Sequence, residues 1–235
     1  MSSKIIYVFD FDGVICNSIN ECMLTSYNAF YRAELINIDD VPNQFKVYFY
    51  KNRHYVRPAK EYYLVCKGYR QQKELSSSLF DEMKSNYSEK MDDFEKVFYL
   101  KRKFLKNKPD IWLAYHVLYK HVAQFISEFS HKFFILTTKD RDSVEMLANH
   151  FEFINKIENI FSKEISTNKT VLFTHLFNKY HYLTNQNKVI YVDDNEFHLS
   201  EVKHFPLKLY FAKWGYAGSQ KFNNFMEINS LKELI

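Results

Sequence analysis

The sequence predicts an α/β protein with a Rossmann-like parallel sheet, helices on both of its faces, and an inserted all-helical cap domain. From about residue 112 onward, short apolar runs alternate with segments of helical periodicity. A further apolar run, residues 5–9, stands alone near the N-terminus, and the stretch that follows it is dominated by helical periodicity. We therefore expect a catalytic core of residues 1–15 and 109–235 and a helical cap of residues 16–108.

The composition is that of a globular protein with one core and room for a smaller domain. Of the 235 residues, 46% are hydrophobic and 26% are charged, and the net charge of +4 is too weak to predict a nucleic-acid partner. The three cysteines form no CxxC pair, and no apolar stretch approaches the ~20 residues that span a bilayer. Because Asp10 interrupts the early apolar run, we expect no signal peptide, no membrane partner and a cytoplasmic location.

The first strand is predicted over Ile5-Ile6-Tyr7-Val8-Phe9, a run that is apolar throughout, as in a strand buried on both faces. Asp10 and Asp12 follow it with one residue between them, so their carboxylates share a side of an extended chain. Two carboxylates held this close repel one another unless a cation or a shared proton lies between them. Gly13 allows a sharp turn, and an ordinary strand-end turn explains the same residues.

The insert is expected to begin with a helix over residues 18–32 and to end with one over about 88–103. Between them, residues 45–69 are rich in tyrosine, phenylalanine and basic side chains. Arg53 and Arg57 in this segment are candidates for contact with a distal anion of a substrate, although a solvated face explains them as well.

The second half of the chain alternates helices and strands. The expected helices cover residues 116–129, 141–151, 169–182 and a last turn near 230, and the expected strands cover residues 132–136, 158–161, 188–192 and 207–212.

Polar side chains follow three of these strands where each one ends. They are Asp10 and Asp12, then Thr137, Thr138 and Lys139, and finally Asp193 and Asp194. Since ligands of open parallel sheets bind beyond the carboxyl ends of the strands, we expect these groups to converge. A cluster of oxygen ligands is typical of a Mg²⁺ site that also binds a phosphate group. The lysine and the threonine would then bind the phosphate oxygens that do not contact the metal.

As a set, these motifs resemble those of the haloacid dehalogenase superfamily, in its phosphoglycolate-phosphatase-like and beta-phosphoglucomutase-like group with a helical cap. The family's opening motif DxDGxxxDS is matched by residues 10–18, except that Asn17 stands where many members carry Asp. The later motifs are matched by Thr137, by Lys169 with Lys163 as its rival, and by the acidic pair Asp193-Asp194. Residues 213–216, Lys-Trp-Gly-Tyr, resemble a frequent family ending.

The resemblance implies a role for each matched residue. Asp10 would attack phosphorus and Asp12 would move the proton. Thr137 and Lys169 would hold the phosphoryl group, and Thr138 and Lys139 would contact substrate. The implied Mg²⁺ ligands are Asp10, the backbone carbonyl of Asp12, Asp194, and Asp193 directly or through a water.

The expected activity is that of a Mg²⁺-dependent phosphatase acting on a small phosphorylated metabolite through an aspartyl-phosphate. A dehalogenase typically lacks the second aspartate, so Asp12 favours phosphoryl chemistry. A phosphomutase, a phosphonate-cleaving enzyme and a non-catalytic protein that binds a phospho-ligand remain alternatives. The sequence determines neither the substrate nor the oligomeric state.

Overall fold

The computed structural model describes residues 5–181, 188–217 and 224–235. These residues form two compact units, one of residues 5–17 with the described part of 117–235 and one of Ser18–His116. None of the helices in the described ranges is long and apolar enough to span a bilayer.

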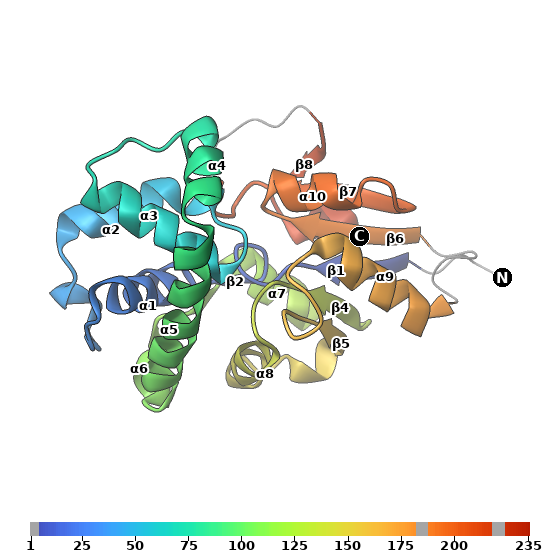
Figure 1. Ribbon diagram of the computed structural model, residues 1–235. Coiled ribbons are helices and arrows are strands. Elements are labelled where there is room, and N and C mark those ends of the chain that lie inside the picture. Colours follow the sequence, from blue (N-terminus) through green and yellow to red (C-terminus); the bar gives the residue numbers. More distant parts are fainter. Residues whose placement is uncertain (1–4, 182–187, 218–223) are drawn as a thin grey trace. The chain divides into compact units, whose positions relative to one another are not determined.

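The first unit contains a parallel sheet whose strands, among the described residues, follow the order β5-β4-β1-β6-β7-β8 (Figure 1). These strands are β1 (Ile5–Phe9), β4 (Phe133–Leu136), β5 (Ile157–Phe161), β6 (Lys188–Asp193), β7 (Leu207–Ala212) and β8 (Met226–Ile228). The helices of this unit are α7 (Lys120–Glu128), α8 (Arg141–His150), α9 (Lys169–Lys179) and α10 (Glu196–Val202). This arrangement confirms the predicted α/β class.

Strand β1 lies in the middle of the sheet and is covered on both faces. Ile6 and Val8 belong to the apolar core shared with α9 and α10. Tyr7 and Phe9 point the other way, where their rings meet Phe129 and Phe125 at 5.1 and 6.0 Å between centroids. Successive side chains of a strand alternate between faces, so a strand covered by helices on both sides has to be apolar throughout.

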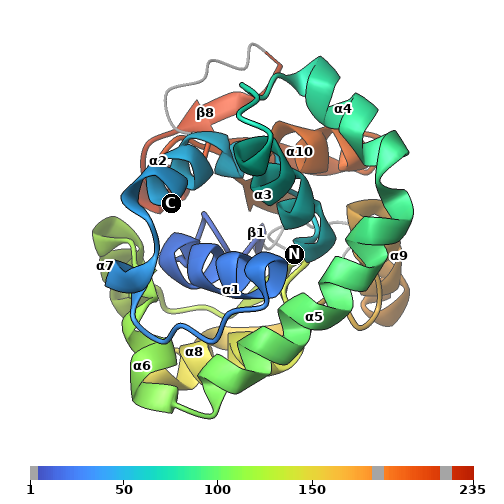
Figure 2. The same cartoon turned by 60° about the vertical axis from the view of Figure 1, so that its left-hand side comes forward.

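The second unit is all-helical and consists of α1 (Ile19–Tyr31), α2 (Asn43–Asn52), α3 (Tyr62–Arg70), α4 (Ser77–Asn86), α5 (Ser88–Lys106) and α6 (Pro109–Ala114), with short 3₁₀ turns between some of them. In Figure 2, which brings this unit forward, α1 and α3 lie beside the long helix α5. Phe45, Phe49 and Tyr62 of the segment 45–69 are buried in the core of this unit, where Tyr62 stacks between Phe49 and Phe98 at 5.4 and 5.5 Å. Packing of large rings in a small helical unit accounts for this aromatic composition.

Two features of the structure differ from the boundaries expected from sequence. The helical unit extends to His116 instead of 108, because Pro109 starts the extra helix α6, where its fixed φ suits a first helical turn. The helix expected over 116–129 begins only at Lys120, since Val117–Leu118 form the short strand β3, which pairs antiparallel with β2 (Cys16–Asn17).

At the other end of the chain, α9 ends at Lys179, and residue 182, its expected end, lies outside the described residues. Strand β8 was not expected, because three residues are too few to show a periodic pattern.

Candidate active site

The loop after β1 starts at Asp10, which is still held in the sheet by a hydrogen bond of 3.0 Å from its N–H to the carbonyl of Val192 in β6. Its side chain is buried. Gly13 has a φ of +87°, a conformation that glycine adopts without strain. The turn that it permits returns the chain to Cys16, whose N–H donates to the carbonyl of Phe11. Asp10 is therefore fixed by the sheet, and Asp12 lies in the tight turn beyond it.

Lys169 connects three strands at this edge of the sheet. It is the first residue of α9, which begins there because the Asn168 side chain accepts a hydrogen bond from the N–H of Val171. Its fully buried ammonium group lies 2.8 Å from the Leu136 carbonyl of β4, 3.0 Å from Asp10 Oδ1 and 3.3 Å from Asp193 Oδ2. Of the two candidate lysines, Lys169 is the one that the structure places against Asp10.

The charges around Lys169 explain the shifted pKa values of its neighbours. Burial opposes the charged ammonium, but Asp10 and Asp193 outweigh it and raise the pKa of Lys169. Burial also opposes ionisation of Asp193, yet Lys169 and His198 hold the pKa of that carboxyl below its usual range. For Asp10, burial dominates and raises the pKa, against the opposing effect of Lys169.

His198 in the first turns of α10 is a member of the site that the sequence analysis did not identify. Its Nδ1 lies 3.2 Å from Asp193 Oδ2, the same oxygen that accepts a hydrogen bond from the hydroxyl of Tyr191. The other oxygen of Asp193 accepts from the N–H of Asn195 at 2.9 Å. Asp193 is thus oriented by a histidine, a tyrosine and a backbone amide.

Asp194 packs against the backbone of two glycines, Gly13 and Gly215. A Cβ on Gly13 would fall 2.3 Å from Asp194 Oδ2, and a Cβ on Gly215 would fall 2.2 Å from its Cβ. The same carboxylate accepts a hydrogen bond of 2.6 Å from the N–H of Tyr216. Residues 213–216, which the sequence analysis matched to a family motif, therefore position Asp194, the second residue of the acidic pair.

The residues that follow β4 lie close to Asp12. The Lys139 ammonium is 3.2 Å from both carboxylate oxygens of Asp12. Thr137 is buried, and its hydroxyl oxygen accepts from the N–H of Lys139 at 3.2 Å. Thr138 is half-buried in the same turn. The structure thus pairs Lys139 with the aspartate predicted to move the proton.

Arg53 and Arg57 lie in the helical unit. Arg53 is buried, donates to the carbonyl of Val56 at 2.9 Å and places its guanidinium 5.1 Å from the centre of the Tyr62 ring. Arg57 lies 3.8 Å from the carboxylate of Asp81. Both therefore have structural contacts inside their own unit.

A divalent cation fits the donor set on three grounds. Asp10, Asp193 and His198 each offer a ligand atom, and these atoms lie within 4.8 Å of one another. Asp10 Oδ1 is buried and, among the described residues, accepts no hydrogen bond, although Lys169 is near. A buried carboxylate with a raised pKa is also the kind of group that a cation stabilises in its charged form.

Comparisons in sequence and in structure gave different results. Neither a scan against models of protein families nor a search of curated proteins found a match. Among solved structures, a haloacid dehalogenase-like family hydrolase of Streptococcus pneumoniae is 16% identical, with a TM-score of 0.65 over 100% of this chain and 98% of that one. A predicted phosphoglycolate phosphatase of Haemophilus somnus is 15% identical, with a TM-score of 0.62 over 92% and 88%.

A third similar structure is described as protein tyrosine kinase A of Mycobacterium tuberculosis, with 15% identity and a TM-score of 0.65 over 100% and 97% of the two chains. Identities this low establish the architecture, and proteins named for different reactions share it. The chain has the fold of the haloacid dehalogenase-like hydrolases, with the helical unit following the first strand of the core.

Proposed function

We propose that the protein is a Mg²⁺-dependent phosphatase that hydrolyses a small phosphate monoester through an aspartyl-phosphate on Asp10. The observation that carries this proposal is the position of the Lys169 ammonium, 3.0 Å from Asp10 and 3.3 Å from Asp193 at the carboxyl edge of the sheet. A nucleophilic carboxylate beside a fixed cation is the arrangement that phosphoryl transfer requires, since catalysis of that reaction is mostly positioning and charge stabilisation.

Each neighbouring side chain has a separate task in this proposal. An oxygen of Asp10 attacks phosphorus, and the alcohol oxygen of the substrate leaves. Asp12 donates a proton to that oxygen and then removes one from the water that hydrolyses the aspartyl-phosphate. Lys139 keeps the Asp12 carboxyl in place, and Lys169 with the Thr137 hydroxyl neutralises and binds phosphoryl oxygens. Thr138 and Lys139 are the further candidates for contact with substrate.

The cation would be held by Asp10 and by the acidic pair Asp193-Asp194, with the Asp12 backbone carbonyl as the remaining proposed ligand. When bound, it supplies positive charge to the phosphoryl oxygens and to the buried carboxylates. Tyr191 and His198 orient Asp193, and the ring of His198 is a further candidate ligand of the cation.

The wider assignments are proposals as well. The substrate is a small phosphorylated metabolite, and Arg53 and Arg57 are candidates for its distal anion. The side chains of Cys16, Cys22 and Cys66 are buried thiols, as expected in a reducing compartment, which supports a cytoplasmic location. No nucleic-acid or membrane partner is proposed.

The first test is release of phosphate from p-nitrophenyl phosphate and from a panel of phosphate monoesters, with and without Mg²⁺. We expect activity with the metal, loss of activity on adding EDTA, and a fall of at least about 10³-fold in kcat for Asp10→Asn, because the nucleophile is gone. Asp110→Asn, which removes an exposed carboxylate of α6, should match the wild type. Activity that survives Asp10→Asn, or wild-type protein inactive on the whole panel, would contradict the proposal.

The alternatives give different products in the same experiment. A phosphomutase would convert a sugar phosphate to its positional isomer without releasing phosphate, and a phosphonate-cleaving enzyme would act on a carbon–phosphorus substrate. A non-catalytic protein would bind the phospho-ligand and leave it intact.

A further inference from the structure

The helical unit contains a basic pocket whose ligand the proposed reaction does not explain. The pocket lies between the end of α1, the end of α3 and the beginning of α5, which pack together in Figure 2. Its volume is about 260 Å³, and it is lined by Ala29, Phe30, Arg32, Tyr63, Lys67, Arg70, Lys90, Asp93 and Phe94. Four cationic side chains and one carboxylate therefore share a small concave site.

The cations of this pocket have no carboxylate partner. Within the described ranges, none of Arg32, Lys67, Arg70 and Lys90 forms an ion pair, whereas the single carboxylate, Asp93, lies 2.9 Å from Lys96. Other cations of this unit do have carboxylate partners: Lys60 pairs with Asp92 and Lys101 with Glu34, each at 2.9 Å. The pocket thus keeps an uncompensated positive charge.

Two of these cations approach the same aromatic ring. The ammonium groups of Lys67 and Lys90 both lie over the ring of Tyr87, at 5.4 and 5.8 Å from its centre. A cation over a ring face is attracted to it, and an anion bound beside the two ammonium groups would reduce the repulsion between their like charges.

Arg32 reaches the pocket from an unusual backbone position. It ends α1 with a φ of +57°, in the left-handed conformation that glycine most often occupies at the end of a helix. Arginine pays a steric cost there that glycine would not. Its presence at the rim of the pocket is therefore consistent with a need for the guanidinium.

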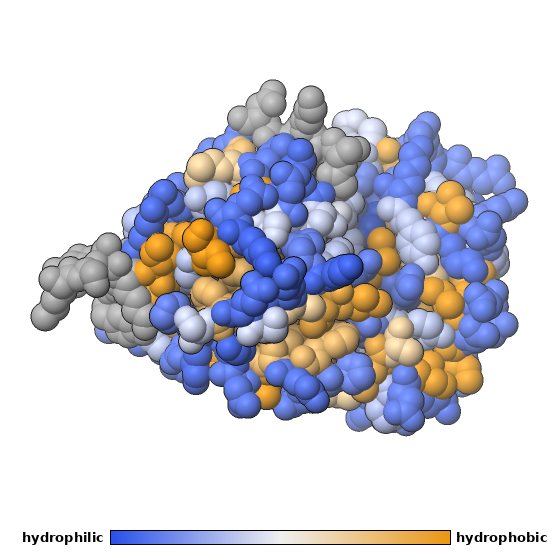
Figure 3. Space-filling view, turned by 180° about the vertical axis from the view of Figure 1, so that it is seen from behind, coloured by the Kyte–Doolittle hydropathy of each residue, from blue (hydrophilic) through white to orange (hydrophobic). Residues whose placement is uncertain are grey.

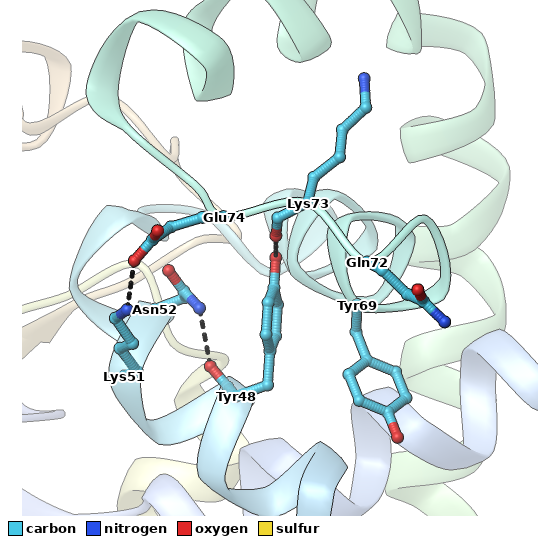
Figure 4. Close-up of a pocket in the computed structure, with 7 residues that line it drawn as sticks. All are labelled: Tyr48, Lys51, Asn52, Tyr69, Gln72, Lys73 and Glu74. Atoms are coloured by element: carbon cyan, nitrogen blue, oxygen red, sulfur yellow. Dashed lines mark hydrogen bonds and ion pairs between the residues drawn. The ribbon is translucent and has the colours of Figure 1, made fainter.

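In a second pocket of the same unit, by contrast, polar groups of the lining residues bond to one another. It is lined by residues of α2, α3 and the segment after α3, and Figure 4 marks contacts among some of its polar groups. Lys51 pairs with Glu74 at 2.5 Å, the Tyr48 hydroxyl donates to the Lys73 carbonyl at 2.6 Å, and the Asn52 amide donates to the Tyr48 carbonyl. The side chain of Lys73 extends away from the other lining side chains in that view.

We propose that the pocket between α1, α3 and α5 binds a small multivalent oxyanion, a diphosphate or a polycarboxylate, at a site of the helical unit separate from the Asp10 cluster. Guanidinium and ammonium groups bind both kinds of anion by charge-assisted hydrogen bonds. The volume is below the roughly 300–1,000 Å³ of pockets for drug-sized ligands, so the bound group is small. The rings of Phe30, Tyr63 and Phe94 form the apolar wall of the site.

The test is isothermal titration of the full-length protein with inorganic diphosphate and, separately, with citrate, both in buffer freed of divalent cations by a chelating resin. We expect binding of at least one of them by the wild type and equally by Asp10→Asn, because the site does not involve the Asp10 cluster. The variant K67Q/R70Q should bind at least about tenfold more weakly. The control K103Q/K108Q, which removes two exposed lysines of the same unit from outside the pocket, should bind as the wild type does.

The single change Lys90→Gln tests the same site with an exposed residue, in case K67Q/R70Q fails to fold by circular dichroism. Preference for diphosphate over citrate, or the reverse, identifies the kind of anion. The proposal is wrong if the wild type binds neither anion at millimolar concentration, or if binding is unaffected by Lys90→Gln and by K67Q/R70Q. Binding that is lost only in Asp10→Asn would likewise overturn it, and would leave the proposed phosphatase activity standing.

Discussion

At the scale of single residues, the candidate site depends on side chains that are held by several partners at once. Asp193 contacts Lys169, His198, Tyr191 and the N–H of Asn195. Each partner removes some rotational freedom of the carboxylate, and a carboxylate fixed before substrate arrives needs no reorganisation during the reaction.

Some of these residues could be predicted from sequence and others could not. Asp10, Thr137 and Asp193 each end an apolar run, so the topology of a parallel sheet was enough to bring them together. The role of Tyr191 could not be predicted, because this residue lies inside an apolar run and is read there as one of its apolar members. His198 had no motif around it, and only the turn into α10 brings its ring back to Asp193.

The first residue-scale prediction concerns Gly215. A Cβ at this position would lie 2.2 Å from the Cβ of Asp194, so Gly215→Ala must push the two loops apart and weaken the hydrogen bond from Tyr216. Overpacking of this kind costs about 1–3 kcal/mol of unfolding free energy. We expect phosphatase activity to fall by at least tenfold, measured as kcat/KM together with urea unfolding.

Asp194→Gly supplies the matched background for this test, since it removes the colliding Cβ. There, the stability cost of Gly215→Ala should largely disappear. An equal cost in both backgrounds would mean that the collision with Asp194 is not its cause.

At the scale of elements, α1 and α5 are joined by a buried ion pair. Arg102 of α5 donates from Nε and Nη2 to the two oxygens of Glu21 in α1, each at 2.9 Å. The hydroxyl of Thr25 also donates to Glu21, and His116 Nε2 lies 3.9 Å away. Both partners are buried, so each charge depends on the other.

We predict that Arg102→Met destabilises the protein by about 3–5 kcal/mol, because it leaves the carboxylate of Glu21 buried without its partner. Urea unfolding followed by circular dichroism measures the change. Lys101→Met is the control: this neighbouring lysine pairs with Glu34, whose side chain is 66% exposed, and its loss should cost about 1 kcal/mol or less.

The double variant Glu21→Met with Arg102→Met should recover much of the loss, since no unpaired charge remains. If Arg102→Met costs no more than Lys101→Met, the buried pair does not contribute in this way.

The strands missed by the sequence analysis share a physical cause. Strands β2, β3 and β8 have two or three residues each, and their pairing depends on which segment lies beside them. Longer elements such as β1 and α5 carry their own apolar pattern and were found near their observed bounds. The short strands are defined by tertiary contacts, which a local sequence pattern does not contain.

At the scale of the whole molecule, large exposed hydrophobic residues are dispersed. The most exposed ones in the described ranges include Leu100 in α5, Val47 in α2 and Val117 in β3, which belong to different elements. On the face shown in Figure 3, hydrophobic residues occur in separate groups among hydrophilic ones. Single exposed apolar residues of this kind are ordinary in globular proteins.

Stability should be distributed unevenly over the sheet. Strand β1 pairs on both sides with β4 and β6, whereas β8 pairs, among the described residues, only with β7 at the edge. We predict that amides of β1 and β6 exchange with deuterium only on global unfolding, and that those of β8 exchange through local opening. Native-state hydrogen exchange with mass spectrometry measures both, and β8 amides as slow as those of β1 would contradict the prediction.

The pairing of β1 also has a consequence for synthesis of the chain on the ribosome. Ile5 pairs with Lys188, so β1 must wait until the chain has been synthesised past residue 188 before its second neighbour exists. At the usual rate of about 5–20 residues per second, this wait lasts roughly ten seconds or longer. The helical unit, by contrast, is one uninterrupted stretch from Ser18 to His116, and every segment it needs has been synthesised before β4 appears. During that interval an apolar strand with unpaired edges is the part of the nascent chain that most needs protection by chaperones.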